Sequence, residues 1–556
     1  MANVSGGELV VRTLLAAGVD NIFTLYGGHL ETIFQSIREH RLAFLDVRHE
    51  VAAGHAAEGY ARSQRRLGVA LITAGPGFTN ALTSITNAWL DRTPVLYICA
   101  SIPQPYAEAN VVQGGFDQVA MATPVTKWAH RVTATGDIPR LLAHAMRIAT
   151  SNPPGPVLLD IPMDVSYATI AADAVPIPGT IFVDDQRTPD GEAIQAALAI
   201  LAHARRPLIM AGEGAWQCGA SDALRRFVAR TGIPVFSDYQ GVGLLPASDP
   251  RYGGGFFKML ELADPIVEPD AVLALGVRFG VYTLGASGLV PNDCKLIHVE
   301  CDGKEIGRLR DADVAIVGDS AQVLEALNAQ AASLSWPDQA PWQRCIADLR
   351  TVRRNQFAEF LRAQATPLHP YQAARLIVDN MPSNTIVVAD GAEAHQWVAE
   401  ALEKENPGEF FTHGHLGCLG FGLGFAMGVS RAHPERPVLC VTGDGAVGIT
   451  LAEFDTMARH RLPVVVAVMN NRCWGATRHF QDLISGPGKN IGVDLGDARY
   501  HDAAVALGCQ GFHVARPEQL KPAIEAAFAC GGPACINIEI SLEDMPPDSV
   551  ALMSHS

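Results

Sequence analysis

Two oxygen-bearing side chains, Asp444 and Asn471, follow two predicted strands in the last third of the chain. An apolar run, Val438–Thr442, predicts a buried strand that ends just before Asp444. A helical stretch, Leu451–Arg459, leads to a second apolar strand, Val464–Met469, which ends just before Asn471 and its neighbouring asparagine. Both side chains would therefore lie at the carboxyl ends of two parallel strands, where α/β sheets place their ligand sites.

These side chains suit a divalent cation that is shared with a phosphorylated ligand. A carboxylate and an amide oxygen are hard donors of the kind that Mg²⁺ prefers, and Mg²⁺ commonly takes further oxygens from a substrate diphosphate. Gly443 and Gly445, on either side of Asp444, would let a diphosphate approach the backbone at the N-terminus of the next helix. An ordinary strand–turn–helix unit with a capping aspartate is the competing interpretation. The Asn-Asn pair after the second strand favours the metal site.

A third candidate, Glu50, lies far from these residues in the sequence. It follows the apolar strand Ala43–Val47 and begins an Ala- and Gly-rich helix within DVRHEVAAGHAAEGYAR. A glutamate at this place could simply complement the positive end of the helix dipole. Glu50 therefore has two interpretations, a helix-dipole partner and a catalytic carboxylate.

The composition fits a large enzyme better than a nucleic-acid-binding protein. The 556 residues exceed the size of one core, which predicts about three domains, and the net charge of −16 argues against a nucleic-acid partner. The first residues lack the basic and apolar regions of a signal peptide, and no run approaches the roughly 18 apolar residues of a membrane span. Eleven scattered cysteines, without a C-x-x-C pair, predict free thiols in a reducing compartment. We therefore expect a cytoplasmic protein with no membrane partner.

Shifts in composition divide the chain into three segments. Strand-like and helix-like runs alternate within residues 1–167, 188–335 and 365–545, and the stretches between them are rich in Pro, Ala and charged residues. Strands that alternate with helices indicate parallel sheets throughout. The sequence therefore predicts an α/β fold of three doubly wound parallel-sheet domains, with linkers over 166–190 and 335–370.

The combined motifs resemble those of thiamine-diphosphate-dependent enzymes of the acetolactate synthase/pyruvate oxidase branch. The strings that carry the resemblance include RHEVAAGHAAEGYAR, TAGPGFTNA, THGHLGCLGFG, VTGDGAVG and MNN, and within the branch they are most similar to benzaldehyde lyases. The resemblance implies a pyrimidine-binding domain, a middle domain and a diphosphate-binding domain, with thiamine diphosphate and Mg²⁺ as cofactors. It also implies a homotetramer, a dimer of dimers, with each cofactor between the pyrimidine-binding domain of one chain and the diphosphate-binding domain of another.

The resemblance assigns a catalytic or metal-binding role to several matching residues. Glu50 matches the glutamate whose hydrogen bond to the aminopyrimidine ring favours the tautomer that removes a proton from the thiazolium ring. His29 and Gln113 match a polar pair that faces the substrate, and His29 would exchange a proton with the substrate hydroxyl. The expected metal ligands are Asp444, Asn471 and the backbone carbonyl of Cys473.

Further positions match the walls of the cofactor site and of the substrate pocket. Leu419 matches the bulky apolar residue that supports the bent cofactor, with plain core packing as the alternative. The expected cofactor-binding residues are Glu50, Gly391, Ala392, His395, Leu419, Gly443, Gly445, Ala446, Asn471, Trp474 and Gly475. The expected substrate-pocket residues are Gly28, Met163, His413 and Ala476.

Three residues depart from the pattern of benzaldehyde lyases. Met163 stands where those enzymes have Trp, His395 where they have Tyr, and Gly28 where they have Ala. A flexible Met and a smaller Gly reshape an aromatic pocket, so strict use of benzaldehyde-derived substrates is not expected. We expect a thiamine-diphosphate- and Mg²⁺-dependent carbon–carbon lyase/carboligase that cleaves 2-hydroxy ketones or forms them from aldehydes.

Other enzymes with the same motifs remain as alternatives. An acetolactate-synthase-like carboligase would act on 2-keto acids, and its relatives carry a flavin and usually lack a residue like His29. A 2-hydroxyacyl-CoA lyase shares the Gly-Gly-His and Arg-His-Glu strings but needs a basic site for coenzyme A. A pyruvate-type decarboxylase normally has a His-His pair, which this chain lacks. A cofactor binder without catalysis is disfavoured because Glu50, Asp444 and Asn471 are all present.

Overall fold

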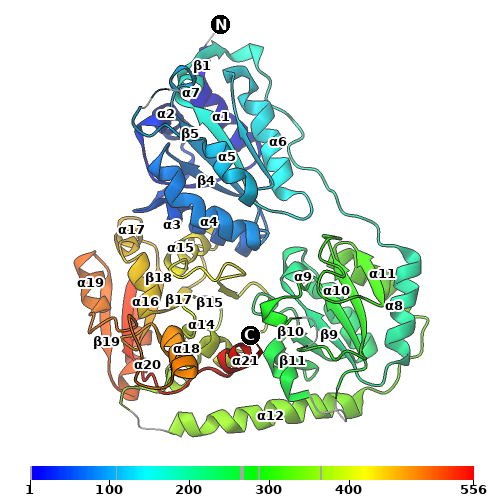
Figure 1. The fold of residues 1–556 in the computed structure, drawn as a ribbon. Coiled ribbons are helices and arrows are strands. Elements are labelled where there is room, and N and C mark those ends of the chain that lie inside the picture. Colours follow the sequence, from blue (N-terminus) through cyan, green and yellow to red (C-terminus); the bar gives the residue numbers. More distant parts are fainter. Residues whose placement is uncertain are drawn as a thin grey trace.

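Three α/β units, each built around a six-stranded parallel sheet, make up the computed structural model of the protein (Figure 1). The structure describes residues 3–107, 109, 111–262, 268–285, 288–362 and 366–555. Each sheet lies within one of the three expected domains, although the expected boundary at residue 365 falls outside the described residues. The predicted fold class is confirmed. No helix among the described residues has the length and apolar character needed to cross a membrane.

The N-terminal sheet carries helices on both faces. Its strands, in spatial order, are β3 (Ala43–Asp46), β2 (Asn21–Thr24), β4 (Gly68–Ile72), β5 (Val95–Ser101), β7 (Val157–Pro162) and β6 (Trp128–Arg131). Its helices are α1 (Gly6–Ala16), α2 (Glu31–His40), α3 (Glu50–Gln64), α4 (Pro76–Leu90), α5 (Gln118–Ala122), α6 (Ile138–Thr150) and α7 (Met163–Tyr167). Every residue of β4 and β5 is buried, as expected for central strands covered on both faces.

The middle sheet has the strand order of a dinucleotide-binding fold, with its topological switch between β9 and β12. Its strands are β11 (Tyr252–Gly255), β10 (Val235–Ser237), β9 (Pro207–Ala211), β12 (Ala271–Leu275), β13 (Lys295–Glu300) and β14 (Val314–Val317). Its helices are α8 (Gly191–His203), α9 (Glu213–Gln217), α10 (Ser221–Thr231) and α11 (Ser320–Ala331). The long helix α12 (Ala340–Arg362) then runs along the base of the middle and C-terminal units (Figure 1).

The C-terminal sheet contains both strands of the candidate metal site. Its strands are β16 (Phe410–Thr412), β15 (Ile386–Ala389), β17 (Val438–Gly443), β18 (Val464–Asn470), β20 (Ala534–Glu539) and β19 (Gln510–Val514). Its helices are α13 (Pro370–Asn380), α14 (Ala394–Ala401), α15 (Gly422–Ala432), α16 (Asp444–Ile449), α17 (Glu453–Arg459), α18 (Gly475–Ser485), α19 (Tyr500–Ala506), α20 (Pro517–Ala529) and α21 (Pro547–His555). β17 and β18 are neighbours in parallel register, as predicted.

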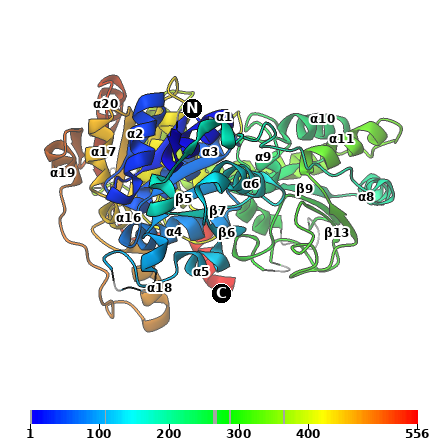
Figure 2. The same ribbon diagram turned by 90° about the horizontal axis from the view of Figure 1, so that it is seen from above.

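The N-terminal unit lies over the C-terminal unit, and the middle unit projects to one side (Figures 1 and 2). The C-terminal helix α21 lies between the middle and C-terminal units (Figure 1). There the Tyr239 hydroxyl donates to Asp548 at 2.6 Å, and the Ser549 hydroxyl donates to Gln396 at 2.8 Å. The last helix therefore joins two domains.

Three expectations about secondary structure need correction. The sheets are not parallel throughout, because β1 (Asn3–Ser5) and β8 (Thr169–Ala171) form a separate antiparallel pair. β8 lies inside the expected linker, and strands of three residues are too short to leave a periodic pattern. The predicted helix over 451–459 begins instead at Glu453, and a separate short helix, α16, begins at Asp444 itself.

Helices α3 and α15 join the N-terminal and C-terminal units through a close glycine contact. A Cβ atom on Gly428 would lie 1.9 Å from the Ala56 carbonyl oxygen, and one on Gly59 would lie 2.2 Å from the Phe425 carbonyl oxygen. The absence of side chains at both positions therefore lets the two backbones touch. Glu50 begins α3, and α15 follows Leu419 closely, so this contact fixes the relative position of two candidate site segments.

Replacing Gly428 by Ala is expected to lower the midpoint of thermal unfolding. The new methyl group must displace the backbone of α3, and overpacking of this kind typically costs roughly 1–3 kcal/mol. Gly191→Ala is the matched control, because a Cβ atom there meets nothing within 4 Å. Differential scanning calorimetry of the two variants tests the contact. Equal midpoints for Gly428→Ala and the unmodified protein would show that the helices can separate without cost.

Candidate active site

Asp444 and Asn471 lie at the carboxyl ends of β17 and β18, on the wall of a small cavity. Asp444 Oδ2 and Asn471 Oδ1 each accept a hydrogen bond from the same Cys473 N–H, both at 3.1 Å. The shared donor therefore holds the two oxygens close to each other, as two ligands of one cation must be. The described residues contain no cluster of three or more His, Cys, Asp or Glu side chains that could hold a metal. The expected site instead combines one carboxylate, one amide oxygen and one backbone carbonyl.

Burial raises the pKa of Asp444 to about 6, although backbone N–H groups, including that of Cys473, oppose the shift. A buried carboxylate of this kind is costly to ionise by itself, and a bound cation would offset the cost. The donor set and its electrostatics therefore fit a hard divalent ion.

Small residues and two helix N-termini surround the rest of the cavity. Helix α16 begins at Asp444 and α18 begins at Gly475, and the first residues of both helices line the cavity wall. Unpaired N–H groups at helix N-termini favour phosphate groups. A Cβ atom at Gly443 would meet nothing within 4 Å, so the backbone there is open to a ligand. The expected cofactor-binding residues that line the cavity are Gly391, Ala392, Leu419, Gly443, Gly445, Ala446, Asn471, Trp474 and Gly475.

A buried aspartate that the sequence analysis missed, Asp390, orders one side of this cavity. Its carboxylate accepts hydrogen bonds from the N–H groups of Gly391 at 2.6 Å, Gly420 at 3.2 Å and Gly422 at 3.0 Å. These bonds fix the turn after β15 to the segment that carries Leu419. The position of Asp390 directly after an apolar strand was a visible signal, but Gly420 and Gly422 lie about thirty residues away in the sequence.

Glu50 occupies a separate place, in the N-terminal unit. Its side chain begins α3 and is only 6% exposed, and its Oε2 accepts a hydrogen bond from Asn80 Nδ2 at 2.9 Å. Asn80 belongs to α4 and is not among the residues predicted for the site. The bond orients the Glu50 carboxylate and leaves its second oxygen beside Gly77. Asn80 is therefore a positioning residue for Glu50.

The glycine-rich turn after β4 gathers the three expected catalytic residues of this unit. A Cβ atom on Gly77 would lie 3.2 Å from Glu50 Oε1, and one on Gly75 would lie 2.8 Å from the Gln113 Cα atom. Gly27, two residues before His29, packs against Thr73 at the start of the same turn. The turn thus brings the loops of His29 and Gln113 close to Glu50.

His29 sits in a single helical turn, η1 (Gly28–Leu30), beside the short helix α7. The Tyr167 hydroxyl donates to the Gly28 carbonyl at 3.0 Å, which holds this turn against the helix that begins with Met163. Partial burial lowers the pKa of His29 below its usual value of 6.5. The imidazole is therefore neutral near pH 7 and can accept a proton.

Within one chain the expected site residues form two groups. The cavity around Asp444 has a volume of about 80 Å³, and all of its wall residues lie between 370 and 544. This volume is well below the roughly 300–1,000 Å³ of a typical small-molecule pocket. Neither Glu50 nor His29, Gln113, Gly28 or Met163 contributes to the wall. A single chain therefore presents two half-sites.

His395, which was expected to bind the cofactor, does not line the cavity around Asp444, and neither does His413, which was expected in the substrate pocket. His395 faces inward from the first turn of α14, and its Nδ1 lies 2.6 Å from the Gly391 carbonyl oxygen. Its ring packs on that of His413, with 4.5 Å between the centroids. Burial lowers the pKa of both side chains, so both are neutral. His413 lines a second, larger cavity, whereas Ala476 lines the cofactor cavity.

Models of three protein domains match the chain, and all three describe thiamine pyrophosphate enzymes. The N-terminal TPP binding domain matches residues 4–121, the central domain matches residues 194–327, and the C-terminal TPP binding domain matches residues 390–538. Each match falls on a different one of the three sheets, although the N-terminal match ends before β6 and β7 and the C-terminal match begins after β15. The C-terminal match includes Asp444 and Asn471, and the N-terminal match includes His29, Glu50 and Gln113.

Curated relatives extend over nearly the full chain. A probable acetolactate synthase of Mycobacterium bovis is 32% identical over 96% of this chain and 95% of its own length. The large subunit of acetolactate synthase isozyme 2 of Escherichia coli is 30% identical over 98% of this chain and 97% of its own length. A probable acetolactate synthase large subunit of Methanocaldococcus jannaschii is 29% identical over 98% of this chain and 93% of its own length. These names support the keto-acid alternative better than the expected aldehyde lyase.

Proposed function

The chain belongs to the thiamine pyrophosphate enzyme family, and we propose that it is a Mg²⁺-dependent carboligase that forms and cleaves 2-hydroxy ketones. The observation that carries the proposal is the proximity of Asp444 Oδ2 and Asn471 Oδ1 beside an open glycine backbone. This donor set suits a metal-bound diphosphate. The neutral His29 near Glu50 supports proton exchange with a substrate hydroxyl.

In this proposal each group of residues has a distinct task. Bound thiamine diphosphate supplies a nucleophilic carbon and an electron sink for bond cleavage. Asp444, Asn471 and the Cys473 carbonyl would hold Mg²⁺ and with it the diphosphate, and Leu419 would support the rings of the cofactor. Glu50, oriented by Asn80, hydrogen-bonds to the pyrimidine ring.

In the same proposal, His29 and Gln113 act on the substrate. His29 takes the proton of the substrate hydroxyl during cleavage and returns one during ligation. Gln113 donates a hydrogen bond to the substrate oxygen.

We further propose that two copies of the chain complete each site, within a homotetramer. The half-site around Asp444 and the half-site around Glu50 lie in different domains. Large apolar side chains are exposed beside both: Leu483 and Ile484 on α18, and Val112 and Phe116 around Gln113. Val112 is 86% exposed and Ile484 is 67% exposed. Apolar patches at two incomplete half-sites favour burial against a partner chain.

The nature of the donor separates two candidate reactions. An aldehyde or 2-hydroxy ketone donor is supported by His29, whereas a 2-keto acid donor is supported by the names of the relatives. We propose the aldehyde donor as the main reaction. Incubating the holoenzyme with benzoin, acetoin, pyruvate or a 2-hydroxyacyl-CoA and analysing the products tests this choice. Turnover of pyruvate alone, with release of carbon dioxide, would favour the acetolactate-synthase-like reaction.

Replacing His29 by Ala is expected to slow cleavage of 2-hydroxy ketones by roughly 10²-fold, a typical contribution of one positioned acid–base group. Because the pKa of His29 is lowered, kcat/KM of the unmodified enzyme should fall only below about pH 6.5, as the imidazole gains a proton. That acidic limb should be absent from the pH profile of His29→Ala. His40→Ala is the control, since this exposed side chain pairs with Glu8 away from the half-sites. Equal losses in both variants would contradict the role of His29.

Met163→Trp is expected to shift preference towards aromatic substrates by roughly tenfold, because one flexible side chain is replaced by a rigid aromatic wall. The quantity to measure is the ratio of kcat/KM for benzoin to that for acetoin. Met121→Trp, at an exposed methionine of α5, is the control. An unchanged ratio in Met163→Trp would contradict the prediction that Met163 lines the substrate pocket.

A further inference from the structure

Helix α17 of the C-terminal unit touches the short connection that leads to Glu50 in the N-terminal unit. Residues 47–49 join the end of β3 to the start of α3, and Glu50 is the first residue of α3. Figure 1 shows α17 on the side of the C-terminal unit that faces the N-terminal unit. One domain therefore contacts the backbone from which another domain presents its expected catalytic carboxylate.

Glu453, the first residue of α17, makes the central contact. It is only 1% exposed, and both of its carboxylate oxygens accept a hydrogen bond from the Arg48 N–H, each at 3.2 Å. The Thr456 hydroxyl donates to Glu453 Oε2 at 2.7 Å, which fixes the carboxylate on its own helix. A buried side chain of a neighbouring domain thus holds the backbone two residues before Glu50.

The same helix also holds the other end of the connection, at Asp46, the last residue of β3. Arg459, at the end of α17, donates to Asp46 Oδ2 at 2.7 Å and to the Asp46 carbonyl oxygen at 2.8 Å. The Nε2 atom of His460 lies 2.7 Å from Asp46 Oδ1. These contacts are partly exposed, so each is expected to be weaker than the buried one.

The backbone of this connection determines where Glu50 lies. His49 is the N-cap residue of α3, and its Nδ1 accepts from the Val51 N–H at 3.2 Å, so the first turn of α3 is built directly on the connection. Asn80 orients the carboxylate of Glu50, whereas Glu453 holds the backbone from which this side chain starts. The two contacts therefore act on opposite ends of the same functional segment.

Stability alone does not account for a carboxylate at position 453. Burial raises the pKa of Glu453 to about 7, although the hydrogen bonds from Thr456 and from the Arg48 backbone oppose the shift. A buried carboxylate with a raised pKa costs folding free energy that a neutral side chain of the same size would not cost.

We propose that Glu453 is a positioning residue for Glu50. By holding the Arg48 N–H, it fixes the start of α3 and thereby the place of the Glu50 carboxylate relative to the pyrimidine ring of bound thiamine diphosphate. A misplacement of about 1 Å can slow a reaction roughly 10²-fold, even when its cause lies away from the reacting atoms. The proposal rests on the proposed role of Glu50 and adds to it a residue from a second domain.

The test measures the step that Glu50 supports, without any substrate. The rate at which the C2 proton of bound thiamine diphosphate exchanges with deuterium is followed in the holoenzyme by NMR after rapid acid quenching. Glu453→Met keeps the length of the side chain but removes the acceptor, so exchange should slow by roughly 10- to 100-fold, with cofactor affinity within about threefold of the unmodified value. Because no substrate takes part, the result does not depend on whether the donor is an aldehyde or a 2-keto acid.

A conservative variant and a matched control separate positioning from general loosening. Glu453→Gln keeps one oxygen for the Arg48 N–H and should restore exchange to within about threefold of normal. Glu409→Met is the control, because it also removes a buried carboxylate, one that accepts from Arg436 at 2.7 Å at the amino end of β16. Both half-sites lie at the carboxyl ends of strands, so Glu409→Met should lower the unfolding temperature and leave the exchange rate unchanged.

A second variant tests the same contact from its other end. Asp46→Asn weakens the pairing with Arg459 and His460 at a partly exposed position, and exchange should slow by roughly twofold to fivefold. If Glu453→Met does not fold, normal exchange in Asp46→Asn overturns the proposal.

Glu50→Gln, measured in the same assay, shows which idea has failed. Slow exchange in Glu50→Gln together with normal exchange in Glu453→Met would overturn the positioning role and leave the role of Glu50 intact. Normal exchange in Glu50→Gln would overturn both. An equal slowing in Glu453→Met and Glu409→Met, or a loss of cofactor affinity in Glu453→Met that exceeds tenfold, would make Glu453 a structural residue only.

Discussion

Replacing Glu50 by Gln is expected to lower kcat by roughly 10²–10⁴-fold while leaving thiamine diphosphate affinity within a small factor of the unmodified value. Gln keeps the size of the side chain and one hydrogen-bonding oxygen, so the bond from Asn80 survives. It loses the negative charge that favours the reactive tautomer of the pyrimidine ring. The measurements are single-turnover rates for acetoin cleavage and cofactor binding by calorimetry.

Asn80→Ala separates the charge of Glu50 from its orientation. This variant keeps the carboxylate but removes the donor that holds Oε2, so a smaller loss of kcat is expected, roughly tenfold, with unchanged cofactor affinity. Near-normal turnover in Glu50→Gln would leave the glutamate as a helix-dipole partner only. A larger loss in Asn80→Ala than in Glu50→Gln would give the asparagine the direct role.

Replacing Asp444 by Ala should raise the Mg²⁺ and thiamine diphosphate concentrations needed for half-maximal activity by at least roughly 100-fold. The variant removes the only carboxylate of the expected ligand set, and the remaining neutral oxygens bind a hard cation weakly. Removing Mg²⁺ from the unmodified holoenzyme with a chelator should abolish its activity. Asp497→Ala, at an exposed residue that pairs with Arg472, is the control. Unchanged metal dependence in Asp444→Ala would place the metal elsewhere.

Glu50→Gln and Asp444→Ala together can test whether each site is shared between two chains. Glu50→Gln disables one half-site and Asp444→Ala the other, so each variant alone has little activity at the Mg²⁺ and thiamine diphosphate concentrations that saturate the unmodified enzyme. After mixing and subunit exchange, hybrid dimers contain one intact site if the half-sites come from different chains, and roughly a quarter of full activity should return. If each chain forms its own site, no combination restores an intact one. Activity that stays at the level of the single variants would therefore contradict the proposed dimer.

The sequence predicted that Asp444 and Asn471 lie together because its signals are local. β17 and β18 are continuous apolar runs, and the polar residues follow their ends directly, so strand order alone brings Asp444 and Asn471 together. The position of Glu50 was predicted in the same way, as the first residue of a helix after a strand. In these cases adjacency in the chain determines adjacency in space.

Other features could not be found by such reasoning because they depend on distant segments. Asp390 acts through N–H groups about thirty residues away, and Asn80 reaches Glu50 from a neighbouring helix. The side chain of His395 points inward and packs against His413, which follows β16, and against Tyr239, which follows β10. The larger cavity forms only where two domains meet. None of these contacts leaves a periodic pattern in one stretch of sequence.

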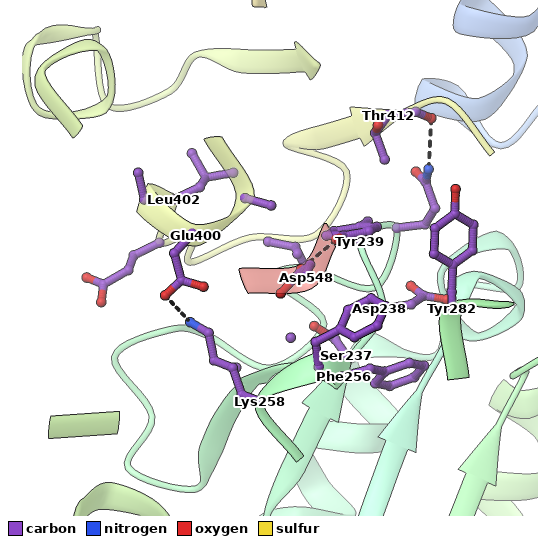
Figure 3. Close-up of a pocket in the computed structure, with 18 of the residues that line it drawn as sticks. Ser237, Asp238, Tyr239, Phe256, Lys258, Tyr282, Glu400, Leu402, Thr412 and Asp548 are labelled. Atoms are coloured by element: carbon purple, nitrogen blue, oxygen red, sulfur yellow. Dashed lines mark hydrogen bonds and ion pairs between the residues drawn. The ribbon is translucent and has the colours of Figure 1, made fainter. Parts of the chain in front are cut away.

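The position of helix α21 has a consequence for how the protein is made. Asp548 and Ser549 fasten the middle unit to the C-terminal unit, yet they are synthesised long after the strands of the middle sheet. During synthesis domains generally fold in order from the N-terminus, so the middle domain completes its own sheet well before this contact exists. The wall that Asp548 gives to the larger cavity (Figure 3) is therefore added only after the strands of both domains have been made. A truncated chain that ends before helix α21 would lack this wall and would leave the cavity open there.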